Sequence, residues 1–351
     1  MSTMPNSVRS GSWLTLLSPF LGVILVNALF VMLTWFNGTL EDYISVGNQR
    51  LIVIHATIIA AAGLGMTVIM ITGGIDLSVG YVISLVTVVM MLTFRAVVYW
   101  EPVGTDLTLV LAGLAALLAG LGTGTSCGVF NGVMIAKLGI VPFVATLAML
   151  GIARGKGIYL TEGGRLSFPS GTSAAPWMKG LGAIDPASIS PGWSWMVFPP
   201  SVWTVIVLAI VVAVVLRYTV LGRHCFAIGS NEATARLCGV RVERTKIILY
   251  SLAGLLTGWA GVLQFCRSNA GSHDVAAGME LSVIAAVVIG GGSLSGGEGT
   301  VLGTLLGALI ISILENGCSR LNLQPDVRYV IIAGIILGVA TVNGWRQRKG
   351  D

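Results

Sequence analysis

An aspartate in a glycine-rich break of an apolar sequence is the first residue that could do chemistry. Asp76 lies in the segment ITGGIDLSVG at 71–80, where Gly73 and Gly74 can end one helix and Asp76 is well suited to N-cap the next. A carboxylate at a membrane-embedded break is by default an ion site, a proton relay or a substrate contact. The structural alternative is a helix cap, which stabilises the helix by about 1 kcal/mol. We favour the cap, because no second acidic residue lies nearby in the sequence.

A second glycine-rich segment repeats this pattern. GGGSLSGG at 290–297 matches GGIDLSVG at 73–80 at five of eight positions, and it places Ser293 where the first segment has Asp76. A relic of duplication and repeated use of one turn chemistry both explain so short a match. We predict that the helix-break and cap residues are Gly73, Gly74, Asp76, Ser78, Gly290, Gly291 and Ser293.

Catalytic motifs are missing from the sequence. LSGGE at 294–298 is close to the LSGGQ signature of ABC-type ATPase domains, but the sequence has no G-x-x-x-x-G-K-[ST] to bind phosphates. His55, His224 and His273 are isolated, and neither H-E-x-x-H nor G-x-S-x-G occurs. We therefore predict no catalytic residue, no metal site and no cofactor on this chain. His55 lies in an apolar stretch, where we expect an interhelical hydrogen bond rather than a proton carrier.

The elements that position these residues are membrane helices. Apolar residues make up 55% of the sequence and charged residues 10%, whereas a soluble domain carries about 25% charged residues. A backbone in lipid must satisfy its own hydrogen bonds, so apolar stretches of about 20 residues are expected to be helices. The fold class is thus an all-α polytopic membrane protein with about ten transmembrane helices, over residues 14–36, 51–72, 81–100, 107–136, 138–153, 196–216, 247–266, 281–297, 299–312 and 329–345. The pair at 281–312 is equally compatible with two half-helices.

The charge distribution predicts the topology of a single transmembrane domain, residues 13–345. Six Lys/Arg lie in the thirty residues 217–246, here called the basic loop. Basic loops are typically cytoplasmic, so we place this loop, the tail 1–12 and the tail 346–351 in the cytoplasm and the segment 162–199 outside. This topology explains the net charge of +5 without a nucleic-acid partner.

Glycines at four-residue spacing predict close helix packing. They occur at Gly120, Gly124, Gly128 and Gly132, at Gly254 and Gly258, at Gly299, Gly303 and Gly307, and at Gly334 and Gly338. Small residues at this spacing let helix backbones approach in lipid, where hydrophobic force between helices is weak. Static packing and sliding helices both remain open, as does a disulfide between Cys266 and Cys318.

The basic loop contains a predicted short helix. Ser230 or Asn231 is a natural N-cap for residues 232–238, and Gly239 stops the helix. Such a helix in the cytoplasm either docks into a groove of a soluble partner or is an ordinary solvated loop.

Four segments, in this order along the chain, carry a resemblance to a known family: ITGGIDLSVG at 71–80, VFNGVMIAKLGIVPFVATLAML at 129–150, LGRHCFAIGSNEATARLCGVRVERTK at 221–246 and VIGGGSLSGGEGTVLGTLLGALI at 288–310. The chain resembles permease subunits of ABC importers for monosaccharides of the ribose/xylose/galactose type. The resemblance implies a coupling helix seated in a cytoplasmic ABC ATPase. We assign this contact to Gly222, Arg223, Asn231, Glu232, Ala233, Ala235, Arg236 and Gly239.

The resemblance also implies the partners and the location. They are a second permease chain, identical or not, an ATPase that holds ATP and Mg²⁺, and a periplasmic or lipoprotein sugar-binding protein. Membrane lipid surrounds the chain in the bacterial inner membrane. The outer segment is richer in tryptophan than the family pattern (Trp177, Trp193 and Trp195), and the basic loop follows the E-A-A…G pattern of other importer permeases only loosely.

The function predicted from the sequence is import of a monosaccharide by alternating access, without catalytic activity on this chain. One alternative is an ion- or proton-coupled secondary carrier of a small polar solute, which would use intramembrane carboxylates. The other is the same importer class with a nucleoside, an inositol or a furanone-type signal as substrate. The sequence identifies no substrate-binding residue.

Overall fold

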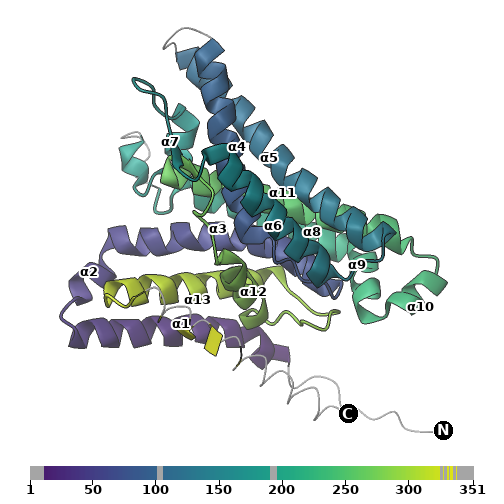
Figure 1. The fold of residues 1–351 in the computed structure, drawn as a ribbon. Coiled ribbons are helices and arrows are strands. Elements are labelled where there is room, and N and C mark those ends of the chain that lie inside the picture. The colour runs from purple at the N-terminus through teal and green to yellow at the C-terminus, as the bar shows by residue number, and fades with distance from the viewer. Residues whose placement is uncertain are drawn as a thin grey trace.

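The computed structural model describes residues 12–100, 106–189 and 196–324, together with residues 327, 330, 331, 333, 334 and 337. The predicted tails at 1–11 and 346–351, most of the predicted helix 329–345, and Trp193 and Trp195 lie outside these residues. The described chain is a bundle of helices, and its only strands are β1 (Arg165–Ser167) and β2 (Ala270–Ser272), which pair antiparallel (Figure 1).

Among the described residues, eight helices are long and apolar enough to span a membrane, and each contains or overlaps one predicted stretch. This confirms the all-α polytopic fold class. The eight are α1 (Ser12–Phe36), α3 (Val46–Ile71), α4 (Val79–Trp100), α5 (Asp106–Lys137), α6 (Pro142–Thr161), α8 (Pro200–Tyr218), α11 (Val242–Ser268) and α13 (Val301–Arg320). Shorter helical elements are α2 (Leu40–Ile44), α7 (Pro176–Gly182), η1 (Pro186–Ser188), α9 (Val220–Ser230), α10 (Glu232–Leu237) and α12 (Met279–Ile289).

The prediction of a full span at 281–297 is wrong. Helix α12 has 11 residues, about half of what a bilayer requires, and it ends before Gly290. Gly291 follows with φ +89°, a left-handed conformation that takes the chain out of the helix. The half-helix alternative therefore holds for α12, whereas α13 is a helix of 20 residues.

Helix α3 is the centre of the bundle. It packs against α11, α13, α12 and α8, and its side chains from Ile54 onward are almost all buried. Ile58, Ile59 and Leu64 are fully buried. By contrast, α1 contacts chiefly α13 and leaves most of its apolar side chains exposed, as a helix facing lipid does. The first helix of the chain therefore lies at the edge of the bundle, and α3 lies at its centre.

Helices α5 and α11 are in direct backbone contact. A Cβ placed on Gly124 would lie 2.6 Å from the Gly258 Cα, and one on Gly254 would lie 2.8 Å from the Gly128 Cα. Real Cβ atoms do not come this close, so both faces require glycine. The predicted packing role of these glycines is confirmed.

Helices α12 and α13 use the same kind of contact. A Cβ on Gly307 would collide with the carbonyl oxygen of Ala286, and one on Gly303 with the carbonyl oxygen of Gly290. The half-helix α12 is thereby held against a full-length helix through its backbone. Such close approach supplies van der Waals contact that apolar side chains alone do not provide in lipid.

Hydrogen bonds join α3 to α13 along one face, which we call the α3–α13 polar seam (Asn48, Ile52 and His55 on α3; Ser312, Glu315, Asn316 and Arg320 on α13). Asn48 and Asn316 exchange two amide hydrogen bonds of 3.0 and 3.1 Å. Arg320 Nε donates to Asn48 Oδ1 at 2.9 Å, and Ser312 Oγ donates to the Ile52 carbonyl at 2.6 Å. The seam fixes the two helices in one register.

His55 makes the interhelical contact that its apolar surroundings predicted. Its Nδ1 lies 3.3 Å from Glu315 Oε2, and the other Glu315 oxygen accepts a 2.7 Å hydrogen bond from Ser282 Oγ on α12. The seam thus extends to a third helix. None of the five cysteines, which all lie in the described residues, is in a disulfide, so Cys266 and Cys318 are not bridged.

Two small helices lie at opposite ends of α11 (Figure 1). At its C-terminal end, a Cβ on Gly182 of α7 would collide with the Cys266 carbonyl oxygen. At its N-terminal end, residues of α10 form ion pairs with Glu243 and Lys246. A helix of 27 residues is about 40 Å long, so α7 and α10 are separated by roughly the thickness of a bilayer.

The α5–α11 contact predicts opposite effects for two glycine substitutions on α5. Gly122→Ala meets no atom within 4 Å and should raise stability by up to about 1 kcal/mol through helix propensity. Gly128→Ala gains the same propensity but places its Cβ against the Tyr250 carbonyl and 2.9 Å from the Gly254 Cα, so we expect a net loss of about 1–3 kcal/mol. Thermal unfolding of the two variants in detergent measures both changes in stability. Equal shifts for the two variants would contradict the packing role.

Candidate functional site

The first helix break turns the chain from α3 into α4. Gly73 has φ +77°, and the Gly74 N–H donates to the Ile69 carbonyl at 3.1 Å, which closes the end of α3. Asp76 Oδ1 accepts from the Ser78 backbone N–H at 2.8 Å and from Ser78 Oγ at 2.6 Å. The Ser78 carbonyl in turn accepts from Val82 N–H, the first intrahelical bond of α4. Ser78 therefore occupies the N-cap position, so the prediction that Asp76 itself caps α4 is wrong. Asp76 instead fixes the turn that precedes the cap.

The surroundings of this break are polar and buried. Asp76 is 7% exposed, and Asn131 on α5 donates from Nδ2 to Ser78 Oγ at 3.3 Å. Thr146 Oγ1 on α6 donates to the Ile75 carbonyl at 3.3 Å. The Tyr250 hydroxyl on α11 lies against Gly74, and among the described residues it has no hydrogen-bond partner. Three helices thus present polar atoms to one turn of the chain.

The second break contains the same turn but a different cap. Ser293 Oγ accepts from the Ser295 N–H at 3.2 Å, the same two-residue step that Asp76 makes to Ser78. Helix α13 begins only at Val301, and its N-cap is Thr300, whose Oγ1 accepts from the Gly303 N–H at 3.0 Å. The prediction that Ser293 caps the next helix is therefore wrong. Gly296 and Gly297, at φ +89° and +77°, keep the chain out of the helix after Ser293.

The two breaks meet in space. The Gly297 N–H donates to the Ile71 carbonyl at 2.9 Å, and a Cβ on Gly296 would lie 3.1 Å from the Gly73 Cα. Residues more than 200 positions apart in the sequence are thus in backbone contact at one end of the bundle.

The basic loop folds as two short helices. Helix α9 is followed directly by Asn231, whose Oδ1 accepts from the Thr234 N–H at 2.9 Å and caps α10. Cys238 ends α10, and Gly239 follows with φ +84°. The capped helix predicted at 232–238 is present, with Asn231 rather than Ser230 as its cap.

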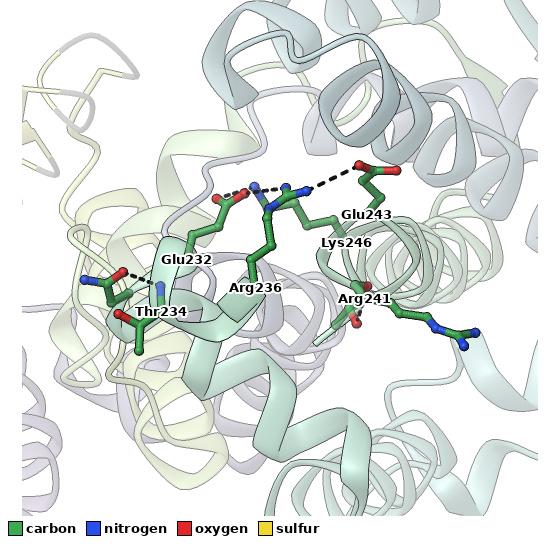
Figure 2. A network of polar contacts seen from close by, with 8 residues as sticks. Glu232, Thr234, Arg236, Arg241, Glu243 and Lys246 are labelled. Atoms are coloured by element: carbon green, nitrogen blue, oxygen red, sulfur yellow. Dashed lines mark hydrogen bonds and ion pairs between the residues drawn. The ribbon is translucent and has the colours of Figure 1, made fainter. Parts of the chain in front are cut away.

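Ion pairs hold α10 on the first turn of α11 (Figure 2). Lys246 Nζ lies 2.7 Å from Glu232 Oε2, and Arg236 lies 3.5 Å from Glu243 Oε1 and 3.7 Å from Glu232 Oε1. Exposed pairs contribute about 0–1 kcal/mol each, but Lys246 is largely buried and links two helices. Glu232 and Arg236, which we predicted to contact a partner, thus also position α10 within this chain.

One face of α10 is buried and the other is exposed. Ala235 is 4% exposed and packs against Ile228 of α9 and Val242 of α11. The assignment of Ala235 to a partner contact is therefore wrong, because its methyl group points into its own chain. Ala233 is exposed, and Leu237, one helical turn further, is 89% exposed.

Leu237 is the residue that the sequence reasoning missed. Glu232, Ala233, Arg236 and Leu237 line a shallow groove on the outer face of α10. An apolar side chain four residues after Ala233, in a predicted helix whose other members are small, polar or charged, was the available signal. We call these four residues the α10 outer face.

Of the other basic-loop residues considered, one is buried and two are exposed. Gly222 is buried in the first turn of α9, where its N–H donates to Thr219 Oγ1 at 3.3 Å and a Cβ would collide with the Leu216 carbonyl. Arg223 and Arg241 are exposed.

The described residues contain no group of three or more His, Cys, Asp or Glu side chains that could hold a metal ion.

Comparison with known proteins places these features in context. Residues 49–340 match the family described as the branched-chain amino acid transport system, permease component. The ribose import permease protein RbsC of Escherichia coli K12 is 33% identical over 322 residues, 91% of this chain and 92% of the relative. RbsC of Bacillus subtilis 168 is 32% identical, covering 93% and 91%. The L-arabinose ABC transporter permease protein AraH of Azospirillum brasilense is 29% identical, covering 98% and 93%. No solved structure matches the chain.

The turn at Asp76 predicts which substitutions there are tolerated. Asp76→Asn keeps an oxygen that can accept from Ser78, so we expect a loss of stability below about 1 kcal/mol. Asp76→Leu leaves two buried donors unpaired, which costs about 1–3 kcal/mol each. Thermal unfolding of the purified variants tests this order. If Asp76→Asn unfolds as readily as Asp76→Leu, the negative charge itself is required.

Proposed function

Because the chain belongs to the permease-component family that its residues 49–340 match, we propose that it forms the translocation path of an ATP-driven importer for a monosaccharide. The predicted importer-permease family is confirmed, and the chain is a multi-pass transport subunit of the bacterial inner membrane without an ATPase site of its own. The observation that carries the sugar assignment is similarity over more than nine-tenths of the chain to relatives whose names specify ribose and arabinose.

The α10 outer face is proposed to seat in the partner ATPase. Helix α10 is capped by Asn231, lies at one end of the bundle (Figure 1) and presents exposed Leu237 next to charged Arg236, which pairs with Glu232. An apolar side chain surrounded by charged ones is the usual composition of an interface core and rim. The ATPase would hold ATP and Mg²⁺, and its closure would push on α10.

The opposite end of the bundle is proposed to face outward. The end that carries α7 and β1 lies about one bilayer thickness from α10, along α11. Its segments are tied to the helices: Arg50 pairs with Asp185 at 2.7 Å, and Arg165 donates to the Ser268 carbonyl at 3.0 Å. This end is suited to receive the sugar-binding protein. As the sequence predicts, we also propose that both termini lie in the cytoplasm and that a second permease chain completes the assembly.

Besides the buried carboxylate of Asp76, whose turn-forming role is described above, the carrier alternative has the His55–Glu315 pair in the bundle interior in its favour. Proton-coupled carriers use such side chains to take up and release protons. In this structure the pair is part of the α3–α13 polar seam and links three helices, so a structural role accounts for it.

The energy source separates these two functions. In proteoliposomes that contain the permease, the ATPase and the binding protein, uptake of ribose or arabinose should require internal ATP and should persist when a protonophore collapses the proton gradient. Uptake that stops with the protonophore while ATP stays high would favour the carrier. Competition by a branched-chain amino acid, a nucleoside, an inositol or a furanone-type signal in the same assay would reveal a different substrate class.

The coupling assignment predicts a specific effect of Leu237→Glu. A charge in the centre of an apolar contact should weaken ATPase binding at least tenfold, whereas the exposed position should leave folding intact. Co-purification of the ATPase and thermal unfolding of the permease are the two measurements. The matched control is Ile184→Glu, at an exposed apolar position near the opposite end of the bundle. Full ATPase retention by Leu237→Glu would exclude the α10 outer face as the docking surface.

A further inference from the structure

The end of α9 lies against the first helix break with no room for a side chain. A Cβ on Gly229 would collide with the Ile71 carbonyl oxygen, and it would lie 2.9 Å from the Ile71 carbonyl carbon. The same Cβ would lie 2.7 Å from the Gly297 backbone nitrogen, in the second break. One glycine of the basic loop is therefore in contact with the backbones of both breaks.

Gly296 of the second break also contacts both Gly229 and the first break. A Cβ on Gly296 would lie 2.9 Å from the Gly229 carbonyl oxygen and 3.1 Å from the Gly73 Cα. With the hydrogen bond from Gly297 to Ile71, three distant segments meet at one point. We call this point the glycine junction (Ile71, Gly73, Gly229, Gly296 and Gly297).

Helix α9 connects the glycine junction to α10 without a flexible linker. Asn231 alone lies between the two helices, and its side chain caps α10. One helical turn before Gly229, on the same face, α9 is also fixed to α3: Cys225 is fully buried and its Sγ donates to the Val68 carbonyl at 3.5 Å. Packed helices transmit displacement as rigid bodies, because close-packed contacts do not deform continuously.

The two breaks, by contrast, contain glycines whose backbone can adopt other conformations. Gly73, Gly296 and Gly297 all have φ between +77° and +89°, where glycine is the residue that moves most freely. Hinges are typically a few such positions that absorb changes in φ and ψ. The junction thus places the rigid end of α9 directly on two flexible turns.

From this geometry we propose that the glycine junction couples the two breaks to α10, so that displacement of α10 moves the end of α3 and the start of α13 together. The proposal rests on the proposed function, because it takes the ATPase as the source of the displacement. A side chain at the contact would change rotamer and absorb part of the movement, whereas backbone contact transmits it. Gly229 is then a positioning residue for transport that touches neither ATP nor sugar.

The substitution that tests this is Gly229→Ala, in the complete complex with ATPase and binding protein. The added methyl group must push the breaks away from α9, but Gly229 does not line the α10 outer face. We expect ATPase retention and basal hydrolysis within twofold of the unmodified complex, loss of the stimulation by loaded binding protein, and at least a tenfold fall in uptake. Gly155→Ala on α6, with no atom within 4 Å, is the matched control and should behave as the unmodified complex.

The outcomes separate this proposal from the proposed function. If the unmodified permease neither retains an ATPase nor imports sugar with ATP, the proposed function fails. If the unmodified complex couples hydrolysis to uptake and Gly229→Ala does so equally well, the glycine junction is static packing and the proposal is overturned.

If Gly229→Ala does not fold, the proposal can still be tested on the unmodified complex. Hydrogen exchange of the unmodified complex, with and without a non-hydrolysable ATP analogue, reports on the amides of 69–78 and 290–300. Movement through one junction should change protection in both segments together. A change confined to α10, or to one break alone, would overturn the proposal.

Discussion

Backbone contact between helices is the constraint on which this structure depends. Apolar side chains gain little by leaving lipid for one another, so a membrane bundle needs close approach or hydrogen bonds to hold its helices in place. Here glycines bring α5 onto α11 and α13 onto α12, while the α3–α13 polar seam fixes the centre. Because α11 carries α7 at one end and α10 at the other, its contact with α5 also holds the two ends of the molecule in relation to each other.

The parts of the fold that a bilayer or a helix end dictates could be predicted from the sequence. Eight spans follow from apolar length, and close helix packing follows from glycines four residues apart, although their spacing does not show that α5 and α11 are partners. The cap of α10 at Asn231 follows from hydrogen-bond chemistry within four residues. These signals are local, or repeat along one helix, and so they can be seen in one sequence.

The parts that depend on distant contacts could not be predicted. Ala235 looks like its neighbour Ala233, and only the packing of α9 and α11 decides which of the two faces inward. The partner of His55 lies on α13, 260 residues later, and neither side chain carries a sign of the other. Ser293 imitates Asp76 in its turn, yet two glycines with positive φ move the start of the next helix to Thr300 and Val301.

The family description and the relatives' names refer to different substrates for chains that share one helix bundle. The matching family is described by branched-chain amino acid transport, whereas the relatives over most of the chain are named for ribose and arabinose. The features that carry our argument are bundle contacts, helix breaks and the α10 outer face, and none of them recognises a particular solute. One such scaffold can therefore serve different substrates when the site that selects them lies elsewhere.

The α3–α13 polar seam has a consequence for how the chain is made. Asn48 and Asn316 are 268 positions apart, so at about 5–20 residues per second the ribosome adds the second one roughly 10–50 s after the first. Throughout that interval α3 is in or beside the membrane with its amide and imidazole groups lacking their final partners. Biogenesis must therefore keep α3 from settling into lipid until α13 arrives, and a chain that ends prematurely before α13 leaves a buried polar helix exposed for proteases to detect.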